Sequence, residues 1–138
     1  MLKIFLASHG KLASGMKSSL DILLGGSENI TIFDAYLDDV TVQEVIEKYI
    51  EGINEDDQVL MLSDLFGGSV NQVMYTYLDR PNFKLISGVN LALLLELSVR
   101  DKPLTDSEIS SIIEDSKNTM KLVNYEEENL DKEVDFFN

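Results

Sequence analysis

Four short segments of the chain are apolar at most positions, which is typical of strands buried on both faces. They span residues 2–7, 29–33, 58–63 and 83–87. Short apolar runs of this kind favour a parallel sheet covered by helices on both sides.

The segments between these runs repeat apolar residues at the spacing of a helix. Thr41 with Glu44 three residues later forms a capping-box pattern, and Gly25 is a stop signal after the first repeat. Thr105 and Ser107 are alternative caps for the last helix. The predicted helices span residues 12–24, 41–53, 69–78, 90–99 and 107–123.

Strands that alternate with helices imply parallel pairing through right-handed crossovers. The predicted fold class is therefore α/β: a three-layer sandwich with a mainly parallel four-stranded sheet and helices on both faces. We expect the first and third strands to be neighbours. Ligands of such sheets bind beyond the carboxyl ends of the strands, so the loops that follow each strand are the first places to examine.

The last residues, 124–138, have a different composition from the rest. This segment contains six acidic residues and one basic residue, Lys132. It also contains two adjacent aromatic residues, Phe136 and Phe137, which are unusual in a purely solvated tail. One interpretation is a solvated tail or a fraying helix end, and the alternative is an edge strand or exchange arm that docks on a neighbour. We expect one domain over residues 1–123, followed by this acidic tail.

Composition excludes several classes of function. The 138 residues carry a formal net charge of −14, which argues against nucleic-acid binding. The absence of cysteine excludes a disulfide framework and a thiol nucleophile, and a single histidine excludes a histidine-pair metal site. No apolar stretch approaches the ~20 residues needed to cross a bilayer, and no export signal is visible. We therefore expect a cytoplasmic protein with no metal site.

Candidate chemistry gathers at the ends of the first and third strands. His9, the only histidine, is followed by Gly10 and then by a predicted helix. If the two strands are neighbours, Asp64 could reach His9 and fix the tautomer of its ring. The alternative is an incidental surface or packed histidine.

The loop after Asp64 offers groups that suit an anion. Gly67 and Gly68 can point consecutive N–H groups at a phosphate, and Ser69 adds a hydroxyl. The alternative is an ordinary loop in which Ser69 caps a helix. No nucleotide-binding glycine motif and no G-x-S-x-G elbow is present, which disfavours nucleotide binding and serine hydrolysis.

Two other strand ends are more simply explained by local structure. Asn90 is expected to cap the helix that follows it. Asp34, Asp38 and Asp39 could suggest a divalent cation, but a solvated acidic loop is the preferred interpretation.

Three motifs together resemble the enzyme IIA domain of the mannose/fructose/sorbose family of the bacterial phosphoenolpyruvate-dependent sugar phosphotransferase system. They lie at residues 4–10 (IFLASHG), 64–69 (DLFGGS) and 87–91 (SGVNL), and the resemblance covers residues 1–120. Many members carry a proline and one further residue between the serine and the asparagine of the second motif. Here Val70 alone stands there, so no role is carried over to Asn71.

The resemblance implies that His9 accepts a phosphoryl group from the phosphocarrier HPr and passes it to enzyme IIB, which serves a membrane permease. Asp64 matches the acid that supports the histidine. Gly10, Gly67, Gly68 and Ser69 are then the expected phosphate-binding residues, with no cofactor. Members of the family are commonly homodimers, and a swapped C-terminal strand is known among them.

Two other functions stay open. One is a phosphotransfer subunit that feeds a dihydroxyacetone kinase, and the other is a regulatory interaction module switched by phosphorylation of His9. Lys11 and Lys17 are expected to flank the phosphate site and to help orient the protein that donates the phosphoryl group.

Overall fold

A computed structural model of the chain describes residues 1–125. Within that part, one sheet has the strand order β2-β1-β3-β4, and every pairing is parallel. The strands are β1 (Leu2–His9), β2 (Ile30–Ala35), β3 (Gln58–Ser63) and β4 (Phe83–Ser87). The predicted neighbourhood of the first and third strands is confirmed.

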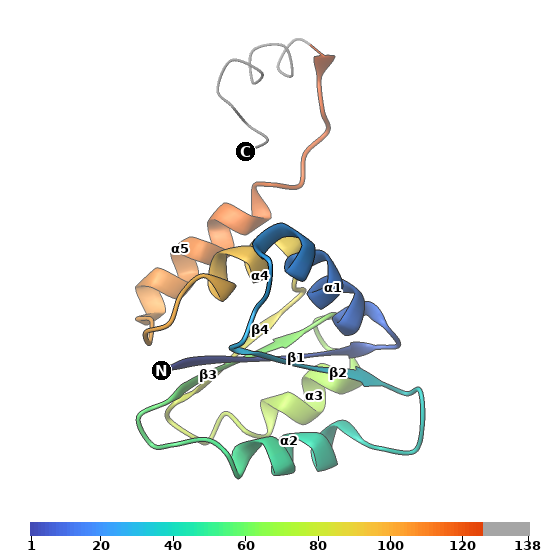
Figure 1. Cartoon of the computed structure of the whole chain (residues 1–138), viewed down its shortest axis with the longest axis vertical. Helices are drawn as coiled ribbons and strands as arrows, with labels where there is room; N and C mark the ends of the chain where they lie inside the picture. The colour runs from blue at the N-terminus through green and yellow to red at the C-terminus, as the bar shows by residue number, and fades with distance from the viewer. Residues whose placement is uncertain (126–138) are drawn as a thin grey trace.

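Helices cover both faces of the sheet (Figure 1). In the view of Figure 1, α1, α4 and α5 lie above the sheet, whereas α2 and α3 lie below it. The helices are α1 (Leu12–Leu24), α2 (Val42–Ile50), α3 (Ser69–Tyr75), α4 (Leu91–Ser98) and α5 (Asp106–Lys117). This arrangement confirms the predicted three-layer α/β sandwich.

The two faces of β1 fill two separate hydrophobic cores. Leu2, Ile4 and Leu6 pack on the side of α1, α4 and α5, whereas Phe5 and Ala7 pack on the side of α2 and α3. The split follows from the backbone, because successive side chains of a strand point to opposite faces. Burial of one large aliphatic or aromatic side chain contributes about 1.5–3 kcal/mol, so β1 is held firmly from both sides.

Three helix starts agree with the predicted caps, whereas Ser69 is the first residue of α3 and its N-cap is Gly68, without a side-chain capping bond. Thr41 and Asn90 each accept a hydrogen bond from the backbone N–H three residues later, at 3.1 and 2.8 Å. Thr105 caps α5 and forms a full capping box with Glu108. Ser107 was the alternative cap, and it lies inside the helix instead.

Three helices end three or more residues before their predicted ends. α2 ends at Ile50 and α3 at Tyr75, whereas the periodicity predicted ends at residues 53 and 78. The largest difference is in α5. α5 ends at Lys117, whereas the periodicity predicted a helix to residue 123. Met120 and Val123, the apolar positions behind that prediction, are 87% and 66% exposed. No surface within residues 1–125 covers them, and helices of this size depend on buried contacts for most of their stability.

Two further predictions concern the end of the chain and the membrane. Most of the acidic tail, residues 126–138, lies outside the described residues, so the choice between solvated tail and docking arm is not decided. Among residues 1–125, no helix is long and apolar enough to cross a membrane.

Candidate functional site

His9 and Asp64 meet at the carboxyl edge of the sheet. His9 is the last residue of β1, and Asp64 directly follows β3, the adjacent strand. Oδ2 of Asp64 accepts hydrogen bonds from the backbone N–H of His9 and interacts with Nδ1 of its ring, both at 2.9 Å. The Asp64 side chain is 10% exposed and that of His9 is 42% exposed. One oxygen therefore holds both the backbone and the ring of the histidine.

The electrostatics of Asp64 favour its charged form. Partial burial raises the pKa of this carboxyl, but the backbone N–H and the ring of His9 outweigh that effect, and the net pKa lies below its usual value. An ionised carboxylate only accepts hydrogen bonds, so Nδ1 carries the proton and donates a hydrogen bond to Asp64. The lone pair of the neutral ring is then on Nε2.

The other oxygen of Asp64, Oδ1, is buried and has no hydrogen-bond partner among the described residues. Unsatisfied buried groups in a native structure are often found where function places them.

Ser69 and Tyr36 lie on the outer side of the ring. Oγ of Ser69 is 3.3 Å from Nε2 of His9. The Tyr36 hydroxyl forms a 2.5 Å hydrogen bond with the same Ser69 oxygen, and the tyrosine and imidazole ring centres are 5.3 Å apart. Tyr36 was not among the predicted site residues. Its position could have indicated a role, because Tyr36 lies in the loop that follows the carboxyl end of the second strand.

The glycines shape the site in more than one way. A Cβ on Gly68 would lie 3.3 Å from Cε1 of His9, so a side chain there would crowd the ring. Gly10 and Gly67 have φ values of +59° and +77°, which L side chains rarely adopt. Glycine is thus favoured at all three positions by local geometry.

The predicted anion donors divide into two groups. The N–H of Gly10 donates to the Ala35 carbonyl at 2.8 Å, and the N–H of Gly68 donates to the Leu65 carbonyl at 3.2 Å. The first bond continues the pairing of β1 with β2 and the second closes a turn, so neither N–H group is free to receive a phosphate in this structure. No hydrogen bond among the described residues uses the N–H of Gly67 or Ser69.

Asn71 supports the floor of the site, a role that sequence reasoning missed. Its side chain is buried and its Oδ1 accepts hydrogen bonds from the hydroxyls of Ser63, at 2.7 Å, and Ser87. Ser63 and Ser87 are partners in the β3–β4 register. The signal that could have identified this cluster was a serine at the end of each of two adjacent strands, with one asparagine on the helix between them.

The start of α1 is held from outside the helix. Lys11, its N-cap residue, forms no side-chain capping bond. The buried Ser8 hydroxyl instead accepts from the N–H of Ala13 at 2.8 Å. Asp34 accepts from the N–H and the hydroxyl of Ser14, at 2.9 and 2.6 Å. The strand ends thus fix α1 next to His9.

These contacts also bear on the acidic loop. Asp34 is used by Ser14, and Asp38 accepts a hydrogen bond from the N–H of Val40 at 2.9 Å. Within residues 1–125, no cluster of three histidine, aspartate or glutamate side chains could hold a metal ion. The local contacts account for Asp34 and Asp38 without a cation.

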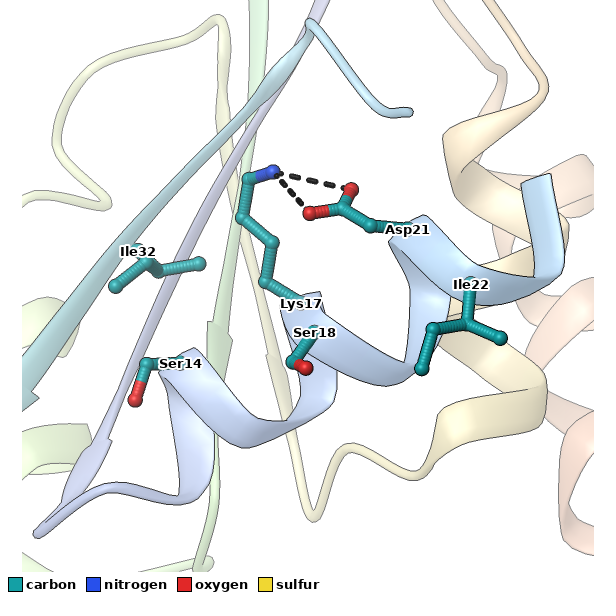
Figure 2. Close-up of a pocket in the computed structure, with 6 residues that line it drawn as sticks. All are labelled: Ser14, Lys17, Ser18, Asp21, Ile22 and Ile32. Atoms are coloured by element: carbon teal, nitrogen blue, oxygen red, sulfur yellow. Dashed lines mark hydrogen bonds and ion pairs between the residues drawn. The ribbon is translucent and has the colours of Figure 1, made fainter. Parts of the chain in front are cut away.

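Lys17 lines an open groove of about 530 Å³ along α1 (Figure 2). Its Nζ contacts both carboxylate oxygens of Asp21, at 3.1 and 3.2 Å. This partner lies one turn further along α1, and no contact with His9 is present. The groove is lined by Ser14, Lys17, Ser18, Asp21, Ile22 and Ile32.

Comparisons with known proteins agree with this geometry. The family model described as "PTS system fructose IIA component" matches residues 3–116. The mannose-specific EIIAB component of Escherichia coli K12 is 27% identical over 126 residues, which is 87% of this chain but 39% of that protein. The fructose-specific EIIA component of Bacillus subtilis 168 is 28% identical over 105 residues, 73% of this chain and 72% of that protein.

Solved structures show the same fold. A Klebsiella pneumoniae protein described as a phosphoenolpyruvate-dependent sugar phosphotransferase system permease superimposes with a TM-score of 0.79. It has 29% identity, over 90% of this chain and 92% of that one. The mannose/sorbose-specific IIA subunit of Enterococcus faecalis gives 0.74 at 21% identity, over 88% and 94% of the two chains. The resemblance predicted from the three motifs is confirmed.

Proposed function

Because the chain belongs to the family of IIA components of the sugar phosphotransferase system, we propose that it is a phosphoryl carrier of a sugar uptake system. His9 accepts the phosphoryl group from HPr and passes it to enzyme IIB, which serves a membrane permease. The observation that carries the proposal is the 2.9 Å contact of Asp64 with Nδ1, since it leaves Nε2 as the nucleophile. We place this carrier in the cytoplasm, where its donor works.

The transfer needs few catalytic groups. The lone pair of Nε2 forms a bond to phosphorus, while the bond between phosphorus and the donor histidine breaks and leaves its electron pair on the donor ring. His9 keeps the proton on Nδ1, so its ring becomes cationic. The Asp64 carboxylate stabilises that charge through the hydrogen bond that already orients the ring. Transfer to enzyme IIB reverses the charge change.

The phosphoryl oxygens need donors on the outer side of the ring. We assign this role to the Ser69 hydroxyl and to the N–H groups of Gly67 and Ser69. The Ser69 hydroxyl is already 3.3 Å from Nε2, and those N–H groups have no other partner within the described residues. Gly10 and Gly68 contribute through close approach and turn geometry.

The test is direct phosphorylation of the intact chain. We expect incubation with phosphoenolpyruvate, enzyme I and HPr to add the mass of one phosphoryl group, and enzyme IIB to remove it. His9→Ala should abolish both events, because the chain has no second histidine. His9→Gln is the control for altered folding, since it keeps a polar side chain near Asp64. A phosphorylated His9→Ala protein with normal relay would contradict the assignment.

We also propose that the chain forms a homodimer, in which residues 1–123 are the carrier domain and residues 124–138 act as an exchange arm. Exposure of Leu122, at 94%, just before the arm and of Tyr125, at 79%, at its start supports an apolar contact there. Deletion of residues 125–138 should weaken self-association in sedimentation experiments. A monomeric full-length chain would contradict the dimer, and an unchanged dimer after the deletion would exclude the arm.

A further inference from the structure

Tyr36 occupies a backbone conformation that requires an explanation. Among residues 1–125 it is the only non-glycine residue with a positive φ, at +69°. It directly follows Ala35, whose carbonyl accepts the N–H of Gly10 at 2.8 Å. The end of β2 is thus tied to the residue after His9. Conformations of this kind persist where the surroundings determine them, and they cluster at functional sites.

The side chain is directed at the candidate site although 61% of the residue is exposed. Its ring is inclined by 32° to the imidazole of His9, with 5.3 Å between the ring centres. Its hydroxyl bonds to Ser69, whose oxygen is 3.3 Å from Nε2. A continuous chain of contacts therefore runs from Tyr36 through Ser69 and His9 to Asp64.

We propose that Tyr36 binds and shields the phosphoryl group after it has been attached to His9, an inference that rests on the proposed function of His9. A phosphorus atom on Nε2 enters the space in front of the Ser69 hydroxyl. The tyrosine hydroxyl then gives up its hydrogen bond with Ser69 and donates its proton to one phosphoryl oxygen, while the Ser69 hydroxyl donates to another. The tyrosine ring covers the adjacent side of the imidazole.

The reaction that Tyr36 slows is hydrolysis. A water oxygen attacks phosphorus, the bond from phosphorus to Nε2 breaks, and its electron pair remains on the ring. Inorganic phosphate is released, and the carrier loses its group without passing it on. A donor that fixes a phosphoryl oxygen and a ring that limits the approach of water both oppose this step. Because Tyr36 is exposed and belongs to a loop, a docking partner can displace it.

The experiment uses potassium phosphoramidate, a small donor that phosphorylates histidine without HPr or enzyme I. After removal of the donor, intact mass follows the loss of the phosphoryl group with time. Tyr36→Phe keeps the ring and removes the hydroxyl. Tyr36→Gly removes both and accommodates the positive φ without strain. Tyr75→Phe is the matched control, because Tyr75 lies in α3 with a similar exposure of 68%.

We expect hydrolysis about threefold to tenfold faster in Tyr36→Phe, the effect of one hydrogen bond to a charged group that is partly exposed. Tyr36→Gly should hydrolyse faster still, and Tyr75→Phe should match the wild type. Thermal unfolding of the unphosphorylated variants separates this role from a structural one, because Tyr36→Phe should leave the midpoint almost unchanged.

Wild-type phosphoryl lifetimes in both Tyr36 variants would overturn the proposal. A His9 that phosphoramidate does not modify would also overturn it, because the proposal requires an accessible Nε2. Failure of HPr to phosphorylate a chain that phosphoramidate does modify would contradict only the carrier function. The two inferences can therefore fail independently.

Discussion

The two sides of the His9 ring are built differently. On the inner side, Asp64 is nearly buried and binds both the backbone and Nδ1 at 2.9 Å. On the outer side, Nε2 faces the Ser69 hydroxyl at 3.3 Å, beneath the exposed Tyr36. The short contact of Asp64 with Nδ1 fixes the orientation of the ring. The longer contact of Ser69 with Nε2 leaves that reactive nitrogen accessible.

This difference suits a group that must exchange phosphoryl with more than one protein. The inner side is anchored to β1 and β3, most of whose side chains are buried, so it presents the same ring orientation to every partner. The loop that joins Asp64 to Ser69 exposes Leu65 and Phe66, at 60% and 82%. Exposed side chains can adjust to different surfaces without disturbing the core. Variants on the inner side should therefore have larger effects than variants on the outer side.

The largest effect is expected for Asp64→Asn. The amide can hold the ring but no longer stabilises a positive charge, and it can favour the wrong tautomer. We expect phosphorylation by HPr to slow by about 10–10³-fold, still at His9. This is less than the roughly 10²–10⁴-fold typical of general acid–base groups, because the donor phosphohistidine is already reactive. Rapid-quench measurement of the mass gain tests this. Transfer at the wild-type rate would remove Asp64 from the mechanism.

The next effect concerns the floor of the inner side. Asn71→Ala leaves the hydroxyls of Ser63 and Ser87 without their shared acceptor, which should destabilise the fold by about 1–3 kcal/mol. Urea unfolding measures this difference. In a chain that already carries Ser63→Ala and Ser87→Ala, the same Asn71→Ala change should lower the free energy of unfolding by less, because the two hydroxyls that need Asn71 as acceptor are already absent. An equal cost in both backgrounds would contradict the role of this cluster.

A smaller effect is expected on the outer side. Ser69→Ala removes one hydroxyl near Nε2 but leaves the ring orientation intact, so we expect phosphorylation to slow by about threefold to tenfold. Ser69→Thr should retain most of the rate, because it keeps the hydroxyl. A loss as large as that of Asp64→Asn would show that the outer side is as critical as the inner one.

The smallest effect should come from the lysines. Lys17 forms an ion pair with Asp21, whereas Lys11 is the N-cap residue of α1, two residues after His9. Of the two lysines expected to flank the phosphate, we therefore retain only Lys11. Lys11→Gln should slow phosphorylation by HPr at low salt by about twofold to threefold and have little effect at high salt. Lys17→Gln is the matched control. Equal slowing at both salt concentrations would exclude steering by charge.

Much of the inner side could be predicted from the sequence. The apolar runs identify four buried strands, and the parallel connection rule brings residues after the first and third strands to one edge. That rule predicts that His9 and Asp64 lie close together. The chain has one histidine, so no other residue competed with His9 as the candidate imidazole. Caps such as Thr41 and Asn90 are local, so their side-chain chemistry was sufficient to predict them.

The outer side could not be predicted in the same way. Tyr36 in the loop after β2 and Ser69 at the start of α3 are 33 residues apart. Their contact depends on how two loops approach each other above the sheet edge. The Gly10 N–H is used by the Ala35 carbonyl of the neighbouring strand, and the Gly68 N–H is used by the Leu65 carbonyl in a turn that glycine permits but does not specify.

The hydrophobic periodicity of this sequence determined the order of elements, the parallel sheet and the edge where His9 and Asp64 lie, because buried strands and capped helices are encoded in local patterns. Tertiary structure decided which atoms meet. Whether Met120 and Val123 continue α5, whether Asn71 joins two strand ends and whether Tyr36 covers His9 depend on surfaces supplied by distant segments. Periodicity reports a preference for burial, but only the folded chain provides the partner.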